Sequence, residues 1–254
     1  MRKIKILALV LILSFLSFLK AGEGFSDENR LDPIYSLNLG LVINNAQYKI
    51  YRSAKLGKSG LYDLRSRLWK NNLPFPKTII YMNKEGYNSF SNFAVEEYEM
   101  SFVWGYTFYH SFGPMRTYVD GQNPYDPSTD IDNTQNLGYE AQAYFSLRND
   151  GVDGGIDSFF NILRIILEPK NQPVLFHCLG GLHRTGMVAM ALRYLQGGNW
   201  INGPKKDGLN PAQYEYHKYN PFLFRPENIE FIEMLANDPR FQELQDTYRL
   251  KLQE

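Results

Sequence analysis

Cysteine is almost missing from this chain of 254 residues, which holds a single one at position 178. A lone thiol forms no disulfide within the chain, so a fold stabilised by disulfide bonds is excluded. It also has no internal partner that would trap it by oxidation. This pattern favours a reactive cysteine over a structural one.

An excess of charge of either sign is missing too, because 27 Lys and Arg residues balance 27 Asp and Glu residues. Nothing in this balance points to a nucleic-acid partner, which usually requires a basic surface. Internal repeats and a second domain boundary are absent as well. Apolar residues make up 44% and aromatic residues 15%, which indicates one globular domain.

Only one long apolar run occurs, at residues 6–19, with basic residues before it and small residues after it. This arrangement is typical of a secretory signal peptide over residues 1–22, followed by a domain over 23–254. Its removal leaves 23 basic and 27 acidic residues, a net charge of −4. We expect a secreted or periplasmic protein without stable membrane association. The run is short for a membrane span, although an uncleaved anchor stays open.

The segment 174–186 has the pattern of a strand, a glycine loop and a helix. Residues 174–176 are apolar and follow a proline, which suits a buried parallel strand, and a mostly apolar helix runs from Thr185. Gly180 and Gly181 lie in the tight loop between them. Backbone N–H groups at such a helix N-terminus bind anions, and phosphate above all.

The side chains that bracket this loop add chemistry to it. The planar guanidinium of Arg184 can hold two phosphate oxygens, and the same positive field lowers the pKa of the Cys178 thiol. A thiolate beneath a bound phosphate is a nucleophile directed at phosphorus.

His177-Cys178, five residues and then Arg184-Thr185-Gly186 resemble the HC-x5-R-[ST]-G signature of the cysteine-dependent protein tyrosine phosphatase superfamily. The resemblance implies that Cys178 is transiently phosphorylated, that Arg184 clamps the phosphoryl group, and that Thr185 assists the departing thiolate. It further implies that His177 tunes the cysteine and that no metal or cofactor takes part. The implied phosphate-binding residues are Leu179, Gly180, Gly181, Leu182, His183 and Arg184.

Alternating strands and helices predict an α/β fold with a central, mostly parallel sheet flanked by helices. The resemblance implies that this is the fold of protein tyrosine phosphatases of the dual-specificity type. The pattern places a helix at 60–71, capped by Ser59 and with Trp69 facing inward. It places strands at 77–82 and 101–112.

The leaving group of a phosphate ester needs a proton, normally from a carboxyl group on a loop. Asp150 lies 28 positions before Cys178 and follows a predicted strand at 139–147, in a stretch that resembles cysteine phytases. The resemblance therefore makes Asp150 the candidate general acid, and Asp153 is the alternative.

Other aspartates fit less well. Asp157 suits the N-cap of a helix over 158–167. If neither Asp150 nor Asp153 is the acid, the long loop at 113–138 supplies it through Asp120 or Asp126. A plain turn at Asp150 is the remaining interpretation.

The resemblance extends to plant and fungal atypical dual-specificity phosphatases, over about 156–235 and more thinly over 51–82. Those enzymes often carry lysines inside the loop, where this chain has none. A polyphosphorylated ligand gains from such cations, so we expect a phosphotyrosine or dual-specificity protein substrate. An inositol polyphosphate is the alternative, and a phosphate-binding module without turnover is less favoured. Outside the loop, charge is available from Arg52, Arg148, Lys205 and Lys206.

Overall fold

The structure is a computed structural model, and it describes residues 38–82, 92–110, 154–178, 180–217 and 226–253. Within these ranges, no helix combines the length and the apolar character needed to cross a membrane.

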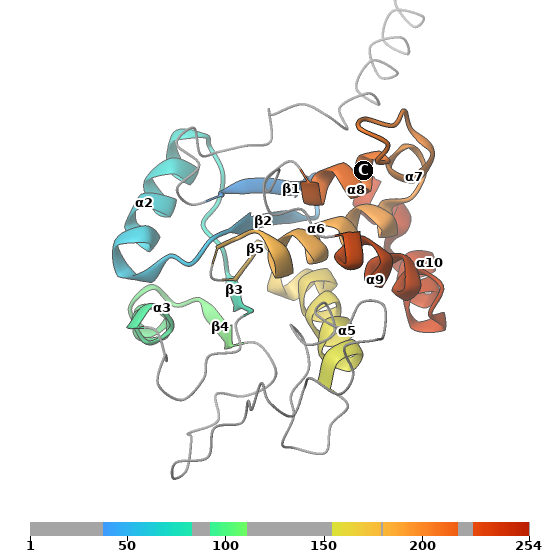
Figure 1. Cartoon of the computed structure of the whole chain (residues 1–254). Coiled ribbons are helices and arrows are strands. Elements are labelled where there is room, and N and C mark those ends of the chain that lie inside the picture. Colours follow the sequence, from blue (N-terminus) through green and yellow to red (C-terminus); the bar gives the residue numbers. More distant parts are fainter. Residues whose placement is uncertain (1–37, 83–91, 111–153, 179, 218–225, 254) are drawn as a thin grey trace, which may run out of the picture.

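Five strands of the described part form one sheet, in the order β1-β2-β5-β3-β4 (Figure 1). All neighbours are parallel except β1, which runs antiparallel to β2. This arrangement confirms the α/β fold with a mostly parallel sheet. The strands are β1 (Gly40–Asn44), β2 (Lys49–Ser53), β3 (Thr78–Tyr81), β4 (Thr107–His110) and β5 (Val174–His177).

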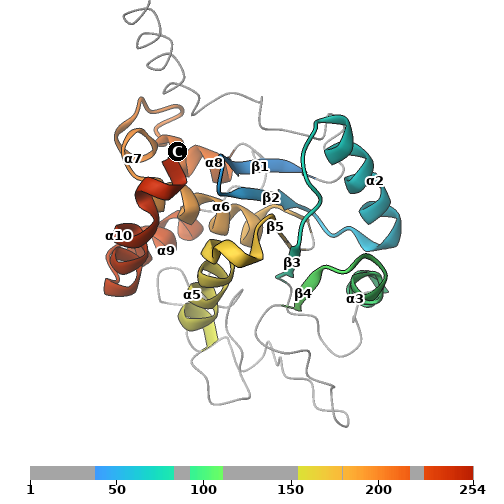
Figure 2. The ribbon, with the colours of Figure 1, turned by 180° about the vertical axis from the view of Figure 1, so that it is seen from behind.

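Helices cover both faces of the sheet, as the two opposite views in Figures 1 and 2 show. One face carries α2 (Gly57–Lys70) and α3 (Asn92–Trp104). The other carries α5 (Gly154–Leu167), α6 (His183–Gln196), α8 (Pro211–His217), α9 (Pro226–Ala236) and α10 (Pro239–Gln253). The short helices η5 (Pro169–Asn171) and α7 (Asn199–Asn202) lie in connections.

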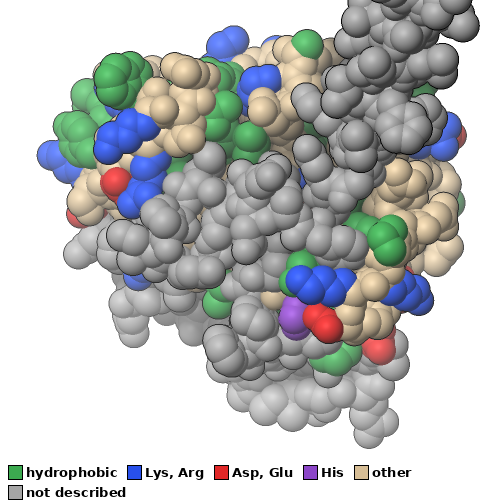
Figure 3. All heavy atoms as spheres, turned by 90° about the horizontal axis from the view of Figure 1, so that it is seen from above, with side chains coloured by type: hydrophobic (Ala, Val, Ile, Leu, Met, Phe, Trp, Pro, Cys, Tyr) green, Lys and Arg blue, Asp and Glu red, His purple; other side chains and the backbone are tan. Residues whose placement is uncertain are grey.

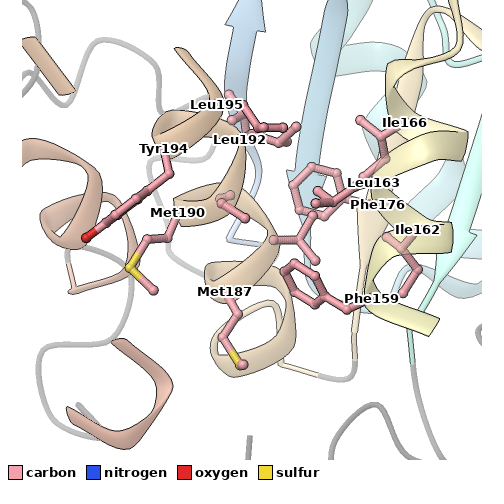
Figure 4. Packing of buried hydrophobic residues seen from close by; sticks show 14 of the residues in the cluster. Phe159, Ile162, Leu163, Ile166, Phe176, Met187, Met190, Leu192, Tyr194 and Leu195 are labelled. Atoms are coloured by element: carbon pink, nitrogen blue, oxygen red, sulfur yellow. The ribbon is translucent and has the colours of Figure 1, made fainter. Parts of the chain in front are cut away.

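The alternation of side chains along β5 divides the core into two clusters. Val174 and Phe176 belong to the cluster under α5 and α6, whereas Leu175 belongs to the cluster under α2 and α3. Figure 4 shows Phe159 and Leu163 of α5 directed towards Phe176 and the facing side of α6. Helix α6 is buried on every side from residue 185 to residue 196, which fits the apolar run at 187–192, and the polar side chains at 185, 193 and 196 are buried with it.

Helix α2 departs from the sequence prediction at both ends. It begins at Gly57 with Leu56 at the N-cap position, so Ser59 lies inside the helix and does not cap it. Trp69 is 78% exposed, because one residue beyond the buried Leu68 turns a side chain by about 100° around the helix. The α2 side of the molecule thus shows apolar side chains next to basic ones (Figure 3).

Two other boundaries also differ. The predicted strand at 101–112 is wrong in its first half, because α3 continues to Trp104 and β4 covers only Thr107–His110. Asp157 is not the N-cap of its helix, since α5 already begins at Gly154.

Candidate active site

Cys178 directly follows β5, the middle strand of the sheet. The register pairs His177 with Ser53 of β2 on one side and with Tyr81 of β3 on the other, so three parallel strands end level with the cysteine. The carboxyl ends of parallel strands are where α/β proteins place their ligand sites. Cys178 itself is only 4% exposed.

The surroundings of Cys178 favour its thiolate. Burial alone would raise the pKa of the thiol, but the charge of Arg184 opposes this effect, as do hydrogen bonds from the Thr185 side chain and from the backbones of Thr185 and Gly181. Together they lower the pKa of Cys178 below its ordinary value. The sulfur is therefore set up as a nucleophile.

The carbonyl groups of the loop are held by two side chains from outside it. Asn38 donates from Nδ2 to the Gly180 carbonyl at 2.8 Å, and Arg52 donates from Nη2 to the Gly181 carbonyl at 2.7 Å. Gly181 has a φ of +66°, and a Cβ there would lie 2.6 Å from the backbone nitrogen of Ala54. Only glycine fits this close approach of the loop to the end of β2.

The last three residues of the signature each have a structural role at the start of α6. Arg184 donates from Nη1 to the Met82 carbonyl at 2.7 Å, which fixes its guanidinium near the end of β3. Thr185 is fully buried, with its hydroxyl 3.5 Å from the Ser53 carbonyl. A Cβ on Gly186 would lie 2.4 Å from the Tyr216 ring, so α8 packs directly on this glycine.

His177 points to the opposite side of the strand end, into the layer of α2 and α3. Its Nε2 lies 2.9 Å from Oε2 of Glu97 in α3, and both side chains are completely buried. Its ring stacks on Tyr81 at a centroid distance of 4.8 Å. Its Nδ1 lies 3.4 Å from the carbonyl of Cys178.

The pKa shifts of His177 and Glu97 both favour the charged forms of the pair. Burial would lower the pKa of His177, but the Glu97 carboxylate and its hydrogen bond raise it above its ordinary value. Burial would likewise raise the pKa of Glu97, but His177 and the backbone N–H groups of Gly57 and Leu56 lower it. The opposite directions of the two shifts favour an imidazolium beside a carboxylate.

A second buried network lies on the other face of the sheet. Arg52 of β2 is fully buried, with Nη1 3.8 Å from Oε1 of Glu215 in α8. Oε2 of Glu215 lies 3.4 Å from Nε of Arg193 in α6, and the Arg193 guanidinium stacks 3.7 Å above the Trp200 ring. The prediction that Arg52 supplies charge to a substrate is therefore wrong, because its buried guanidinium holds the Gly181 carbonyl of the loop.

Most of the predicted site residues come together in this one loop and at its two ends. These are His177, Cys178, Gly180, Gly181, Leu182, His183, Arg184 and Thr185. Leu179, Asp150, Asp153, Arg148 and the segment 113–138 lie outside the described residues. The Nζ of Lys206 lies 4.4 Å from the centroid of the Tyr214 ring. Among the described residues, no three His, Cys, Asp or Glu side chains are grouped to hold a metal ion.

Sequence reasoning missed Glu97 and Asn38. Neither belongs to a motif, and each reaches the loop from a distant part of the chain, so no local pattern marks them. The run Glu96-Glu97 reads as a solvated helix face, yet Glu96 is partly exposed while Glu97 is wholly buried.

Residues 115–252, more than half of the chain, match the sequence model of the tyrosine phosphatase family. The chain belongs to this family. The match includes the loop described above and agrees with the superfamily expected from the signature.

Curated relatives are similar to part of the chain. Inositol diphosphatase SIW14 of Saccharomyces cerevisiae is 33% identical over 112 residues, covering 41% of this chain and 37% of SIW14. Inositol diphosphatase DSP2 of Oryza sativa is 40% identical over 124 residues, covering 46% of this chain and 52% of DSP2. The similarity thus spans about a third to a half of each relative's length.

The fold is similar to a solved structure, the core catalytic domain of the PP-IP phosphatase SIW14 in complex with citrate. The superposition covers 84% of this chain and 94% of that domain, with a TM-score of 0.50 and 21% identity. At this identity the likeness concerns the fold alone.

Proposed function

We propose that this chain is a cysteine-dependent phosphatase that acts on inositol phosphates carrying a diphosphate group. The observation that carries the proposal is the buried Cys178, whose thiolate is favoured by Arg184 and by the N-terminus of α6. The substrate class rests on the relatives SIW14 and DSP2, which are inositol diphosphatases. These relatives support the inositol phosphate alternative over the protein substrate that the lysine-free loop favours.

The reaction has two displacements at phosphorus. The Cys178 sulfur attacks the terminal phosphorus, a sulfur–phosphorus bond forms, and the bond from phosphorus to the bridging oxygen breaks. Arg184 and the loop N–H groups hold the oxygens that gain charge in the transition state. Water then attacks the phosphocysteine, inorganic phosphate leaves, and the thiolate returns with the Thr185 hydroxyl hydrogen-bonded to it.

A diphosphate substrate also suits the leaving-group chemistry. The group that departs from a phosphoanhydride is a phosphate, whose second pKa is about 6, so it needs little protonation. An alkyl phosphate releases a much more basic alkoxide and depends strongly on a general acid. We therefore expect the diphosphate to react faster than the monoesters on the same inositol ring.

A turnover panel tests the proposal. Phosphate release is measured from an inositol phosphate bearing one diphosphate group, from inositol hexakisphosphate and from a phosphotyrosine peptide. We expect kcat/KM for the diphosphate to exceed the other two by at least about tenfold, since each 1.4 kcal/mol of transition-state binding is a factor of ten. Mass analysis of the product should show loss of one phosphate from the diphosphate position.

Two results would overturn this assignment. A preference for the phosphotyrosine peptide would return the chain to the protein phosphatase interpretation. Binding of all three compounds without turnover would make it a phosphate-binding module. The Cys178→Ser variant is the control in each assay, because it removes the nucleophile and leaves the rest of the loop in place.

A further inference from the structure

Glu97 is a buried acid that the two displacements above do not use. It lies in the middle of α3, and its side chain is inaccessible to solvent. Placing a carboxylate in such surroundings costs several kcal/mol unless partners satisfy its oxygens. The oxygens of Glu97 must therefore have partners inside the protein.

The two carboxylate oxygens serve different elements. Oε1 accepts the backbone N–H groups of Leu56 and Gly57, both at 2.9 Å, where α2 begins without a side-chain cap of its own. Oε2 lies 2.9 Å from Nε2 of His177 at the end of β5. One carboxylate thus joins α3, the N-terminus of α2 and the catalytic strand.

The ring of His177 stands between this carboxylate and the nucleophile. Nε2 faces Glu97, and Nδ1 lies 3.4 Å from the carbonyl of Cys178. Each ring nitrogen thus faces an oxygen acceptor, and this arrangement favours the imidazolium, which carries a proton on both nitrogens. Among the described residues, the other titratable groups facing the pair are Tyr81, stacked on the ring, and Tyr106, whose hydroxyl donates to the Glu97 backbone carbonyl.

We propose that Glu97 is a positioning residue of the active site, which keeps His177 protonated and so holds Cys178 as a thiolate. This inference rests on the proposed function for its catalytic meaning, but not for its test. The Cys178 charge is among the interactions that raise the pKa of His177. The coupling is mutual, so an imidazolium at position 177 favours the thiolate at 178 by the same amount.

Glu97→Gln tests the proposal, because glutamine keeps the shape and an acceptor oxygen for α2 but carries no charge. The buried imidazolium then loses its counter-ion and gives up its proton. The variant removes one negative and one positive charge, of which the positive one is adjacent to Cys178. We therefore expect the pKa of Cys178 to rise by about one unit or more, which leaves roughly ten times less thiolate on the acidic side of the titration.

The measurement needs no substrate. Since Cys178 is the sole cysteine of the chain, the ultraviolet absorbance of the thiolate, titrated against a Cys178→Ser baseline, reports this residue alone. Failure of the proposed function, seen as absence of turnover in the wild type, is thus distinct from failure of this inference. Where turnover is present, Glu97→Gln should lower kcat/KM mainly on the acidic side of the pH–rate profile.

Glu96→Gln is the matched control. The adjacent carboxylate also accepts a backbone N–H from the first turn of α2, that of Lys58 at 2.7 Å, but it makes no contact with His177 in the described structure. We expect its thiolate titration to follow the wild type. An equal shift in both variants would mean that α2 is merely loosened and would overturn the proposal.

A titration of folded Glu97→Gln that coincides with the wild type would overturn it too. If Glu97→Gln does not fold, the proposal is tested on the wild-type protein, in which nitrogen NMR measures the protonation of the histidine rings. The proposal requires the His177 ring to stay protonated at pH 7, where an ordinary histidine is mostly neutral. A neutral His177 ring at that pH contradicts it.

Discussion

At the scale of single residues, Cys178 combines burial with a charge, two properties that oppose each other. Burial raises the pKa of a thiol, so the thiolate depends on the groups that surround the sulfur. Arg184 supplies charge, and Thr185 and Gly181 supply hydrogen bonds. The nucleophile is thus a property of the loop as a whole.

Cys178→Ser should therefore fold normally, bind vanadate or phosphate and lose at least about a thousandfold in turnover, because a serine hydroxyl in this field remains protonated. Steady-state kinetics and vanadate titration measure the two effects. Activity close to the wild-type value would remove Cys178 from the mechanism. Replacement of Arg184 by alanine is a further test of the same loop. It should lower kcat by about a hundredfold or more, because the transition state loses this contact.

The residues of the signature could be predicted because their spacing is set within one short loop. Cys178 and Arg184 are near each other in the chain, so the pattern alone brings them together. Glu97 could not be predicted in this way, since it lies 80 positions before His177 and only the packing of α3 on the sheet joins them. The sequence predicts chemistry where it is local and misses support that comes from tertiary structure.

At the scale of elements, the loop is braced by a network that joins β2, α6 and α8. Glu215 lies between Arg52 and Arg193, and Arg52 also binds the Gly181 carbonyl. The start of α2 also depends on a distant residue, because its N–H groups donate to Glu97 of α3 and not to the neighbouring Ser59. The positions of α2, β3 and β5 followed from the sequence pattern, whereas the start of α2 depends on this distant partner, and residues 101–104, predicted as strand, end helix α3 instead.

Arg52→Met should lower the free energy of unfolding by about 3 kcal/mol, because it leaves part of the Glu215 charge and the Gly181 carbonyl buried without this partner. Urea unfolding measures the change. Arg67→Met is the matched control, since Arg67 pairs with Asp63 on the surface of α2, where such a pair contributes about 0.5 kcal/mol. Equal losses in both variants would show that burial of the Arg52 network adds nothing.

At the scale of the whole molecule, the central position of β5 lets both helix layers act on one loop. Glu97 approaches its start from the layer of α2 and α3, and Glu215 supports it from the layer of α6 and α8. A middle strand also has a neighbouring strand on each side: Arg52 of β2 binds the Gly181 carbonyl, and the Met82 carbonyl after β3 accepts a hydrogen bond from Arg184. Cleavage after the first 22 residues and export remain predictions from the sequence, which the mass of the exported protein tests.

The mechanism also needs a general acid that protonates the leaving group, and Asp150 remains our candidate from the sequence. Asp150→Asn should lower kcat by about a hundredfold for an alkyl phosphate, the scale of a lost general acid, and less for an aryl phosphate with a better leaving group. The falling limb of the pH–rate profile on the basic side should flatten, because the group that must stay protonated is gone. The diphosphate substrate should also lose little, since its leaving group needs little protonation.

Asp153→Asn is the control for this prediction, because it removes a carboxylate three positions away in the same glycine-rich stretch of the sequence. If Asp153→Asn shows the dependence on the leaving group and Asp150→Asn does not, the acid is Asp153. If neither variant shows it, the acid comes from the segment 113–138, and Asp120→Asn and Asp126→Asn become the variants to measure. A loss that is equal for alkyl, aryl and diphosphate substrates would instead assign Asp150 to folding or binding, because proton donation must follow the basicity of the leaving group.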